Sequence, residues 1–354
     1  MSEKQKLRIL LIGDLHIQPS TVPDFRKFKE EFFEKLEELK PDLVIQLGDI
    51  LHTHQTVHIT CLCEAVEFLQ EVVRRKYRMI LLIGNHDRLN NSDFQSDFHA
   101  FTAIKNTEDT QLIIVNKTRE VFIMGHRLIC APYVSPGRFM EALSTVDNPL
   151  QGTSCFFAHQ EFLHAKMGII ESEHGDPWDV SYPPCYSGHV HDFDQLQSNL
   201  VYTGTPYMTS FGELDGKGLM LLTIEESGEY THQRIPLSVS NSKKKIHWTT
   251  KDILERKKVP VEFEKYQIKI IINGLNTEKK AICSNNYYKE LSKKYKISYK
   301  GIRNRGKDQK DKKDLSFYKN KTFSELMNEQ LITDMTDKIK INFHQKIING
   351  ELPE

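Results

Sequence analysis

The sequence predicts an α/β fold, a two-sheet α/β sandwich followed by a small C-terminal capping region and a helical tail. Early in the chain, short apolar runs alternate with amphipathic stretches of helical spacing, the pattern of parallel strands joined by helices. Between residues 111 and 224, strand-like runs follow one another with few helices between them, which favours two packed sheets. A chain of 354 residues is also longer than one ordinary core needs and predicts about two domains.

The first elements are three buried strands and two helices. Leu7–Gly13, Leu43–Gly48 and Met79–Gly84 are short apolar runs that end in glycine, as expected of central parallel strands. Between them, Asp24–Leu39 and Glu64–Arg75 place their apolar residues at helical spacing. The order is therefore strand, helix, strand, helix, strand.

Further strands are expected at six later apolar runs: Gln111–Val115, Val121–Met124, Leu128–Cys130, Ser154–Phe157, Leu200–Tyr202 and Gly218–Ile224. Beyond them, Ile268–Ile272 predicts one more strand and Asn286–Tyr295 a helix, and the residues after Thr322 show helical periodicity. The predicted domains are a catalytic domain (1–240), a basic linker (241–257), a reduced capping domain (258–305), a polar connection (306–321) and a helical segment (322–354).

The charge distribution supports a boundary near residue 240. The chain has 48 basic and 48 acidic residues, and a net charge of zero taken alone argues against a nucleic-acid-binding protein. However, residues 1–240 contain 21 basic and 33 acidic residues, whereas residues 241–321 contain 24 and 9. The neutrality is a cancellation between an acidic and a basic region, so it does not exclude DNA as a partner.

Composition excludes several other classes of protein. Hydrophobic residues make up 39% and aromatic residues 10% of the chain, which is enough for a packed core and excludes wholesale disorder. No apolar run reaches the roughly 20 residues of a membrane span, so no membrane association is expected. The six cysteines include no CxxC pair and are expected to be reduced thiols. We therefore expect an intracellular protein, cytoplasmic or, for a eukaryotic or viral source, nuclear.

Asp, His and Asn residues gather where the predicted strands end, which is where open α/β sheets build their sites. Five motifs share this placement: Gly13-Asp14-Leu15-His16, Gly48-Asp49-Ile50-Leu51-His52, Gly84-Asn85-His86-Asp87, Ala158-His159 and Gly188-His189-Val190-His191. A single Gly-Asp or His-x-His is usually a turn or a surface pair, but five such motifs together are specific. His54 and His58 fit no ligand role and are expected to be exposed loop residues.

These residue types suit borderline-to-hard divalent cations such as Mn²⁺. Five segments supply enough ligands for two ions, and a single ion would leave ligands idle. Two ions roughly 3.5–4 Å apart can activate water and stabilise the attacking and leaving oxygens of a displacement at phosphorus. A carboxylate that bridges both ions is expected in such a centre, and Asp49 is the candidate.

The order of these motifs resembles the calcineurin-like metallophosphoesterase superfamily over residues 7–224. The resemblance implies a two-metal phosphoesterase with Mn²⁺, or alternatively Mg²⁺, as cofactor. It assigns Asp14, His16, Asp49 and His191 to one ion, and Asp49, Asn85, His159 and His189 to the other. His86 would be the acid that protonates the leaving oxygen.

Segments after the last motif resemble the SbcD-type DNA repair nucleases and the recombination endonuclease subunits of large phages. These segments are Tyr202–Pro206, Ser210–Glu213 and Lys217-Gly218. The phosphatase branch typically has glutamate where Asp87 stands, and His52 matches a histidine that some of these nucleases keep near the metals. The resemblance implies a DNA exonuclease or endonuclease of double-strand-break repair or recombination, with a capping domain that bears on DNA. It also implies an SMC-like, SbcC-type ATPase partner that docks on residues 322–350.

Two other functions remain open. One is a metal-dependent phosphodiesterase or phosphatase acting on nucleotides or phosphoproteins, and the other is a DNA-tethering scaffold that does not cleave. A homodimer is a weaker expectation. It would pair through an apolar helix face that is more typical of a buried core, formed by Leu62, Ala65, Val66 and Leu69.

Overall fold

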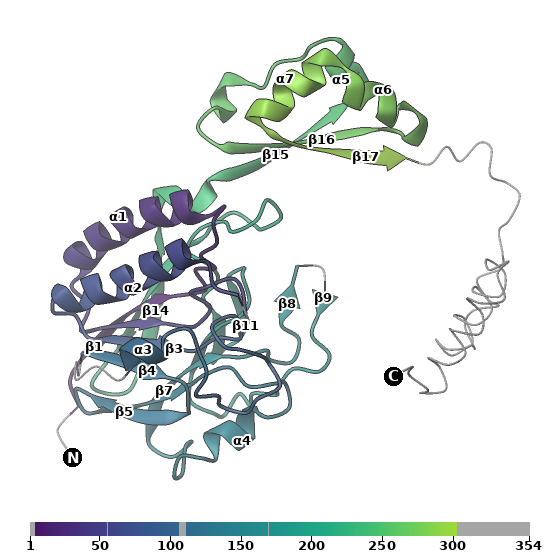
Figure 1. The fold of residues 1–354 in the computed structure, drawn as a ribbon. Helices are drawn as coiled ribbons and strands as arrows, with labels where there is room; N and C mark the ends of the chain where they lie inside the picture. The colour runs from purple at the N-terminus through teal and green to yellow at the C-terminus, as the bar shows by residue number, and fades with distance from the viewer. Residues whose placement is uncertain (1–3, 55, 106–110, 169, 303–354) are drawn as a thin grey trace, which may run out of the picture.

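The computed structural model describes residues 4–54, 56–105, 111–168 and 170–302 (Figure 1). The predicted polar connection (306–321) and helical segment (322–354) lie outside the described residues. Of the helices that the structure describes, none has the length and apolar content needed to cross a membrane.

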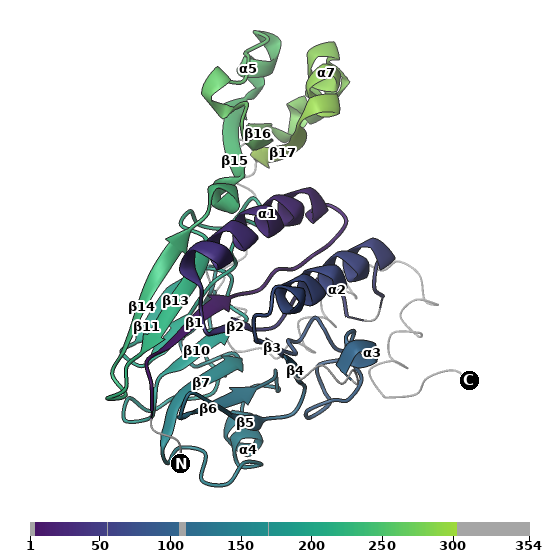
Figure 2. The same ribbon diagram turned by 90° about the vertical axis from the view of Figure 1, so that its left-hand side faces the viewer.

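A six-stranded sheet with helices on one face forms the first half of the fold. Its strand order is β14-β13-β1-β2-β3-β4. Strands β1 to β4 run parallel, β13 pairs antiparallel with β1, and the edge strand β14 pairs antiparallel with β13. The strands are β1 (Leu7–Ile12), β2 (Leu43–Gln46), β3 (Met79–Leu82), β4 (Leu112–Val115), β13 (Gly218–Ile224) and β14 (Tyr230–Pro236). The helices are α1 (Val22–Leu39), α2 (Ile59–Arg74) and the short α3 (Thr102–Lys105). Figure 2 shows α1 and α2 side by side over this sheet.

A second six-stranded sheet packs on the other face of the first. Its order is β11-β12-β10-β7-β6-β5, and β6, β7, β10 and β12 are mutually parallel. The strands are β5 (Arg119–Ile123), β6 (His126–Ala131), β7 (Thr153–His159), β10 (Cys185–Gly188), β11 (Asp194–Gln197) and β12 (Leu200–Tyr202). The helix α4 (Phe139–Leu143) and the small hairpin of β8 (Lys166–Met167) and β9 (Ile170–Glu171) complete this domain.

Alternation along the central strands explains the two layers. In β1, Leu10 and Ile12 face the helices, whereas Ile9 and Leu11 face the second sheet, and all four are fully buried. Successive side chains of a strand point to opposite faces, so a strand that is apolar throughout must be covered on both sides. The predicted two-sheet α/β sandwich is therefore confirmed.

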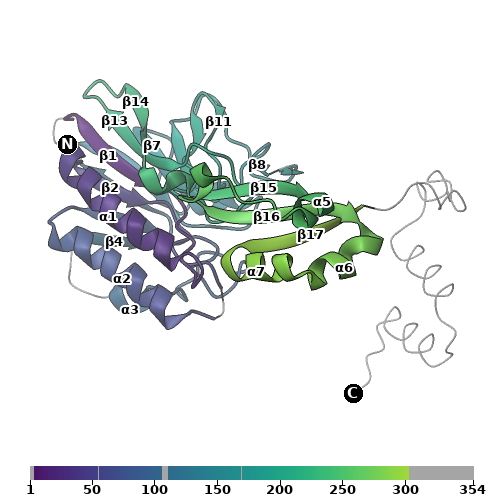
Figure 3. The ribbon, with the colours of Figure 1, turned by 90° about the horizontal axis from the view of Figure 1, so that it is seen from above.

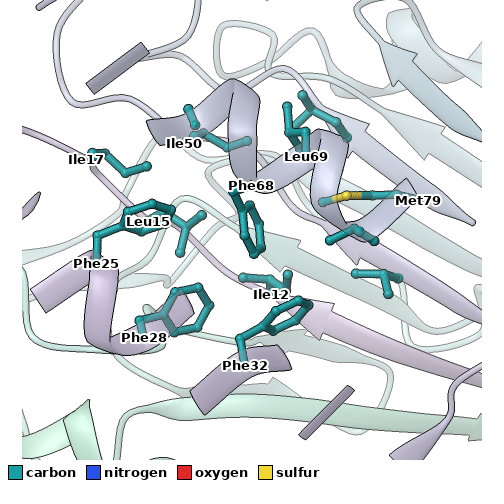
Figure 4. Packing of buried hydrophobic residues seen from close by; sticks show 14 of the residues in the cluster. Ile12, Leu15, Ile17, Phe25, Phe28, Phe32, Ile50, Phe68, Leu69 and Met79 are labelled. Carbon is teal, nitrogen blue, oxygen red and sulfur yellow. The ribbon is translucent and has the colours of Figure 1, made fainter. Parts of the chain in front are cut away.

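Aromatic residues of α1 and α2 fill the helix-facing core (Figure 4). The Phe68 ring lies 5.8 Å from that of Phe25 and 5.1 Å from that of Phe32. The apolar face considered for dimerisation belongs to the same core, because Ala65 and Leu69 are fully buried there and two neighbours pack against it, Leu62 and Val66.

A small second domain follows the sandwich. Three parallel strands, β15 (Lys243–Thr249), β16 (Gln267–Leu275) and β17 (Lys296–Ile302), form its sheet. Its helices, α5 (Thr250–Leu254), α6 (Lys279–Ser284) and α7 (Asn286–Lys294), lie on the sheet face that points away from the sandwich (Figure 1). The short 3₁₀ turns η2 (Val261–Phe263) and η3 (Asn276–Glu278) complete it, whereas η1 (Ser238–Asn241) precedes it and places Val239 in the helix-facing core of the sandwich. We call residues 243–302 the cap.

The basic linker predicted over residues 241–257 is wrong. This segment forms β15 and α5, which are parts of the cap. Ile246 and Trp248 alternate with polar residues along β15 and pair in register with Ile270 and Ile272 of β16, in the same core. The lysine-rich composition concealed this strand alternation.

Buried polar contacts anchor the cap on α1. Lys243 Nζ lies 2.6 Å from Asp24 Oδ2, and both side chains are buried. Gln267 Nε2 donates to the other oxygen of the same carboxylate at 2.7 Å. Lys243 also donates to the Met208 carbonyl. Seen from above, the cap is displaced to one side of the sandwich, and α1 and α2 remain uncovered (Figure 3).

Candidate metal centre

The two sheets bring all the predicted site residues to one edge. Each motif follows the carboxyl end of a central strand: Asp14 and His16 follow β1, Asp49 and His52 follow β2, Asn85 and His86 follow β3, His159 ends β7, and His189 and His191 follow β10. Because these strands are parallel to their neighbours within each sheet, their carboxyl ends meet at the same edge. Residues up to 177 positions apart therefore share one cluster.

Asp14, His16 and His191 form one group of possible metal ligands, with donor atoms within 4.8 Å of one another. The Nε2 atoms of His16 and His191 lie 2.9 Å apart. His16 Nε2 is also 3.8 Å from Asp14 Oδ2. These are the residues assigned to the first ion apart from Asp49.

Asp49, His159 and His189 form a second such group. Asn85 Oδ1 joins it, 3.0 Å from both His159 Nε2 and His189 Nδ1. Asp49 Oδ2 lies 3.3 Å from His159 Nε2 and 3.7 Å from His16 Nε2 of the first group. Asp49 therefore stands between the two groups, where a bridging carboxylate would be placed.

The backbone around these side chains is held in unusual conformations. His16, Asp49 and His189 have φ values of 44°, 55° and 82°, in the left-handed region that side-chain-bearing residues rarely adopt. Backbone N–H groups in these segments fix the two carboxylates of the site: His86 N donates to Asp49 Oδ1 at 2.8 Å, and His189 N donates to Asp14 Oδ1 at 3.0 Å. Strain of this kind persists only where surrounding structure imposes it, and it concentrates at functional sites.

The glycines of the motifs leave room for the ligands. A Cβ on Gly84 would lie 2.1 Å from Asp49 Oδ1, and one on Gly188 would lie 2.7 Å from Asp14 Oδ1. Gly48 has φ of 102° and would place a Cβ 2.4 Å from His159 Nδ1. At these three motifs, the glycine is therefore a packing requirement of the site.

Replacing Gly84 with alanine should displace the Asp49 carboxylate, because the new methyl group overlaps it. We expect metal affinity to fall roughly 10- to 100-fold, as it does when a ligand loses its orientation. Isothermal titration with Mn²⁺ measures the change, and Gly212→Ala is the control, since a Cβ there meets no atom closer than 3.7 Å. Equal affinity in the two variants would contradict the packing argument.

The electrostatics of the site fit cations. Burial raises the pKa of Asp14, and the nearby Asp49 charge raises it further. Burial opposes ionisation of Asp49 as well, but His159 beside it holds the pKa of that carboxyl well below its usual range. Burial alone would lower the pKa of His159, but the nearby carboxylates of Asp49 and Asp14 raise it to about 9. Two buried carboxylates with few donors are costly unless positive charge compensates them.

The hydrogen bonds of His159 also suit metal binding. Its Nδ1 lies 2.7 Å from the Leu47 carbonyl, which accepts from it and leaves Nε2 free to face Asn85 and Asp49. A ligating histidine is typically oriented in this way by a partner on its other nitrogen. The donor set of two carboxylates, four imidazoles and one amide oxygen therefore fits two divalent ions.

Sequence analysis gave no structural role to a charged network behind His191. Glu213 Oε1 lies 3.7 Å from His191 Nδ1, and Glu213 accepts from Ser210 N at 2.8 Å. Lys217, almost fully buried, pairs with Glu213 at 3.2 Å and with Asp192 at 2.7 Å. In the sequence, the Ser210–Glu213 segment and Lys217-Gly218 indicate only a resemblance to the DNA repair nucleases. Their spacing of four residues is the signal that could have predicted an ion pair.

Asp87 ties two of the motif loops together. Its carboxylate accepts from Leu51 N at 3.0 Å, from Ile50 N at 3.3 Å and from Gly84 N at 3.2 Å. Burial and the nearby Asp49 charge raise the pKa of Asp87 to about 7. Asp87 therefore fixes the loop after β2 against the loop after β3.

His86 lies at the open side of the cluster among other histidines. Its Nδ1 is 2.7 Å from the His52 carbonyl, so Nε2 is the free nitrogen. The His16 ring meets it edge-on at 4.9 Å, and the His52 ring lies parallel at 5.6 Å, with His52 Nδ1 3.4 Å from His16 Nδ1. Burial lowers the pKa of His86.

His54 differs from its prediction as an exposed loop residue. Its ring is half-buried and stacks on the His86 ring with centroids 4.4 Å apart. His58, in contrast, is exposed and precedes α2. Only the path of the loop after β2 separates these two cases, and no local pattern signals it.

Comparison with known proteins agrees with this geometry. The sequence model of the family described as calcineurin-like phosphoesterase matches residues 7–201. "Putative phosphoesterase 244L" of Invertebrate iridescent virus 6 is 37% identical over 279 residues, 78% of this chain and 93% of that protein. "Putative phosphoesterase 078R" of Invertebrate iridescent virus 3 is 27% identical over 303 residues, 85% of this chain and 86% of that protein.

A likeness among solved structures is more distant. The structure titled "GAP50 the anchor in the inner membrane complex of Plasmodium" is 11% identical, with a TM-score of 0.43 over 66% of this chain and 90% of that one. The family match covers the five motifs up to His191 and both ligand groups. This chain, with its paired clusters of carboxylates and histidines between two sheets, therefore belongs to the calcineurin-like phosphoesterases, metal-dependent hydrolases of phosphoester bonds.

Proposed function

We propose that this phosphoesterase is a two-metal DNA nuclease, an exonuclease or endonuclease of double-strand-break repair or recombination. The metal centre alone suits any phosphoester, including the nucleotides or phosphoproteins of the alternative function. The observation that favours DNA is a row of lysines on the open face of the cap, next to the metal centre.

The lysine row consists of Lys245, Lys269 and Lys296, which lie in register across the three strands of the cap. The alternating residues Ile246, Ile270 and others face the helices, so the lysines occupy the opposite, open face. None of the three has an ion pair with another residue that the structure describes. Like charges placed opposite one another on a sheet are destabilising, and a polyanion would offset this cost.

The lysine row reaches the loop that supports the metal ligands. Lys296 Nζ lies 5.7 Å from the centre of the Phe211 ring, and a Cβ on Gly212 would lie 3.8 Å from Lys245 Nζ. The next residue is Glu213, which is 3.7 Å from His191. A phosphate backbone that followed the lysine row would therefore lead toward the ions.

The proposed reaction is hydrolysis of a phosphodiester. Asp14, His16 and His191 would hold one ion and Asn85, His159 and His189 the other, with Asp49 shared. When bound, two such ions activate water and stabilise the charge that develops at phosphorus. The His52 carbonyl fixes the His86 ring so that protonated Nε2 can deliver its proton to the departing 3′-oxygen. Mn²⁺ is the proposed metal, with Mg²⁺ as the alternative.

Replacing Lys245, Lys269 and Lys296 together with glutamine should weaken DNA binding. The plot of log affinity against log salt concentration should become shallower, with the magnitude of its slope reduced by about 2 to 3, since each phosphate contact contributes nearly one unit of slope. We expect DNA cleavage at limiting substrate to fall at least about tenfold relative to hydrolysis of bis-(p-nitrophenyl) phosphate.

The matched control is glutamine at Lys279, Lys280 and Lys289, exposed lysines on the helices of the same cap. It removes the same charge from the opposite layer. An unchanged salt slope in the first variant, or an equal loss in both, would contradict the role of the lysine row.

We further propose an SMC-like ATPase as the partner, from the resemblance alone, since the docking segment lies outside the described residues. Pulldown of such an ATPase by the full chain, compared with a chain ending at residue 321, tests it. A non-cleaving scaffold would be favoured by altered ligands, whereas each predicted ligand is present. A homodimer stays a prediction, and the apolar face of α2 considered for it belongs to the core.

A further inference from the structure

We propose that a cavity beside His86 is the subsite for the leaving side of the substrate and that it takes a nucleoside. The inference rests on the proposed function, because it assumes that His86 protonates the leaving oxygen. It goes further by naming the chemical group that the site holds beyond the scissile bond and by giving His54 a part in binding it.

The position of the cavity follows from the orientation of His86. The Nδ1 atom of His86 lies at hydrogen-bond distance from the His52 carbonyl, and the His54 ring stacks on a face of the His86 ring. The proton on Nε2 passes to the departing oxygen as its bond to phosphorus breaks and the bond from water to phosphorus forms. The group attached to that oxygen must therefore lie close to His86, and the rings of His52 and His54 flank His86 at 5.6 Å and 4.4 Å.

A cavity of about 610 Å³ opens there, and His52, Thr53, His54, Thr56, Leu89 and Asn91 are among its lining residues. Its volume is in the ordinary range for sites that bind small molecules. Among the described residues, its lining carries no carboxylate, lysine or arginine. It is therefore unsuited to a second phosphate, which argues that an uncharged part of the substrate occupies it.

The chemistry of the lining matches a nucleoside. Imidazole rings stack on nucleobases, and base stacking on flat side chains tolerates any of the bases. Asn91, Thr53 and Thr56 are exposed. The Asn91 amide and the Thr56 hydroxyl can hydrogen-bond to base edges or sugar, whereas the Thr53 hydroxyl donates to the Thr56 carbonyl and is left as an acceptor. The leaving serine, threonine or tyrosine of a phosphoprotein would leave most of these groups unused.

The ring of His54 is the fixed wall of this subsite. Its face is set by the stack on His86, and its Nδ1 is buried without a hydrogen-bond partner among the described residues. Packing on His86 therefore orients it. Its role is specificity for the leaving nucleoside, separate from the proton transfer of His86.

Two substrates test the subsite in the full chain with Mn²⁺. Thymidylyl-(3′→5′)-thymidine has thymidine as its leaving group, whereas thymidine 5′-(p-nitrophenyl phosphate) releases p-nitrophenolate. Asn91→Trp fills the cavity, and Glu226→Trp is the control on the exposed turn between β13 and β14. We expect Asn91→Trp to lower the ratio of kcat/KM, dinucleotide over ester, at least about tenfold, and the control to leave it unchanged.

A second pair of variants isolates the ring of His54. His54→Ala should lower the same ratio, and His54→Phe should restore most of it, because phenylalanine keeps a flat face. Equal ratios in His54→Ala and His54→Phe, or an unchanged ratio in Asn91→Trp, would overturn the subsite. In either case, cleavage of the dinucleotide by the wild type would still support the nuclease. A wild type that hydrolyses only phosphomonoesters would overturn both the subsite and the proposed function.

Discussion

His86→Ala is expected to lower kcat for DNA cleavage about 10²- to 10⁴-fold, the usual contribution of a general acid. The free Nε2 of His86 is the proton source, and its loss leaves the departing 3′-oxygen as an alkoxide. Metal binding should survive, because His86 is not one of the assigned ligands and its backbone N–H, which donates to Asp49, is retained in alanine. Cleavage of a DNA duplex and Mn²⁺ titration, performed on the same preparation, measure the two quantities.

The leaving group provides a sharper criterion for this variant. Nitrophenolate departs without a proton, so hydrolysis of thymidine 5′-(p-nitrophenyl phosphate) should lose far less activity than DNA cleavage. His58→Ala is the matched control, since His58 is exposed at the start of α2 and touches none of the site. A His86→Ala enzyme that cuts DNA at the wild-type rate would show that the acid is another group.

Asp49→Asn is expected to remove activity almost entirely, by about 10³-fold or more, equivalent to roughly 4 kcal/mol of transition-state stabilisation. Asp49 Oδ2 lies 3.3 Å from His159 Nε2 and 3.7 Å from His16 Nε2, so both ligand groups lose the same carboxylate. Metal analysis after equilibrium dialysis should then find fewer than two ions per chain. Two fully occupied sites in the variant would refute the bridging role.

Thermal unfolding distinguishes lost binding from lost folding. His159 beside Asp49 holds the pKa of Asp49 well below its usual range, so the ionised carboxylate stabilises the metal-free fold at neutral pH and that contribution is lost in the variant. We expect Tm in EDTA to be lower than that of the wild type, with a single cooperative transition retained. Mn²⁺ should raise Tm of the wild type much more than that of the variant, because ligand binding stabilises by mass action. Asp42→Asn, at an exposed carboxylate that accepts from Arg8 N, is the control.

Much of the sandwich could be predicted because its signals are local. Uninterrupted apolar runs such as Leu7–Ile12 indicate strands covered on both faces, and helical spacing in Val22–Leu39 indicates the covering helix. The cap was harder, since β15 is lysine-rich and its alternating Ile246 and Trp248 were not recognised as a strand. In that segment, composition was a stronger signal than periodicity, and it was misleading.

The candidate ligands were also predictable from sequence, because glycine followed by Asp, Asn or His at the end of a strand is a local pattern with a known place in α/β sheets. Glu213 and His54 were not assigned a role in the site. Glu213 lies more than twenty positions after His191, with β11 and β12 between them, and His86 lies more than thirty after His54, with α2 and β3 between them. Such contacts depend on how loops return to the site, which no local spacing specifies.

The sequence by itself determined the fold class, the strand ends that carry the ligands and the acidic and basic halves of the chain. Only the tertiary structure decided that Asp49 stands between two ligand groups and that Lys245, Lys269 and Lys296 form one row beside them. The physical reason is strand register. Pairing across a sheet is fixed by packing and hydrogen bonds between distant segments, so residues separated by dozens of positions become neighbours only when the chain folds.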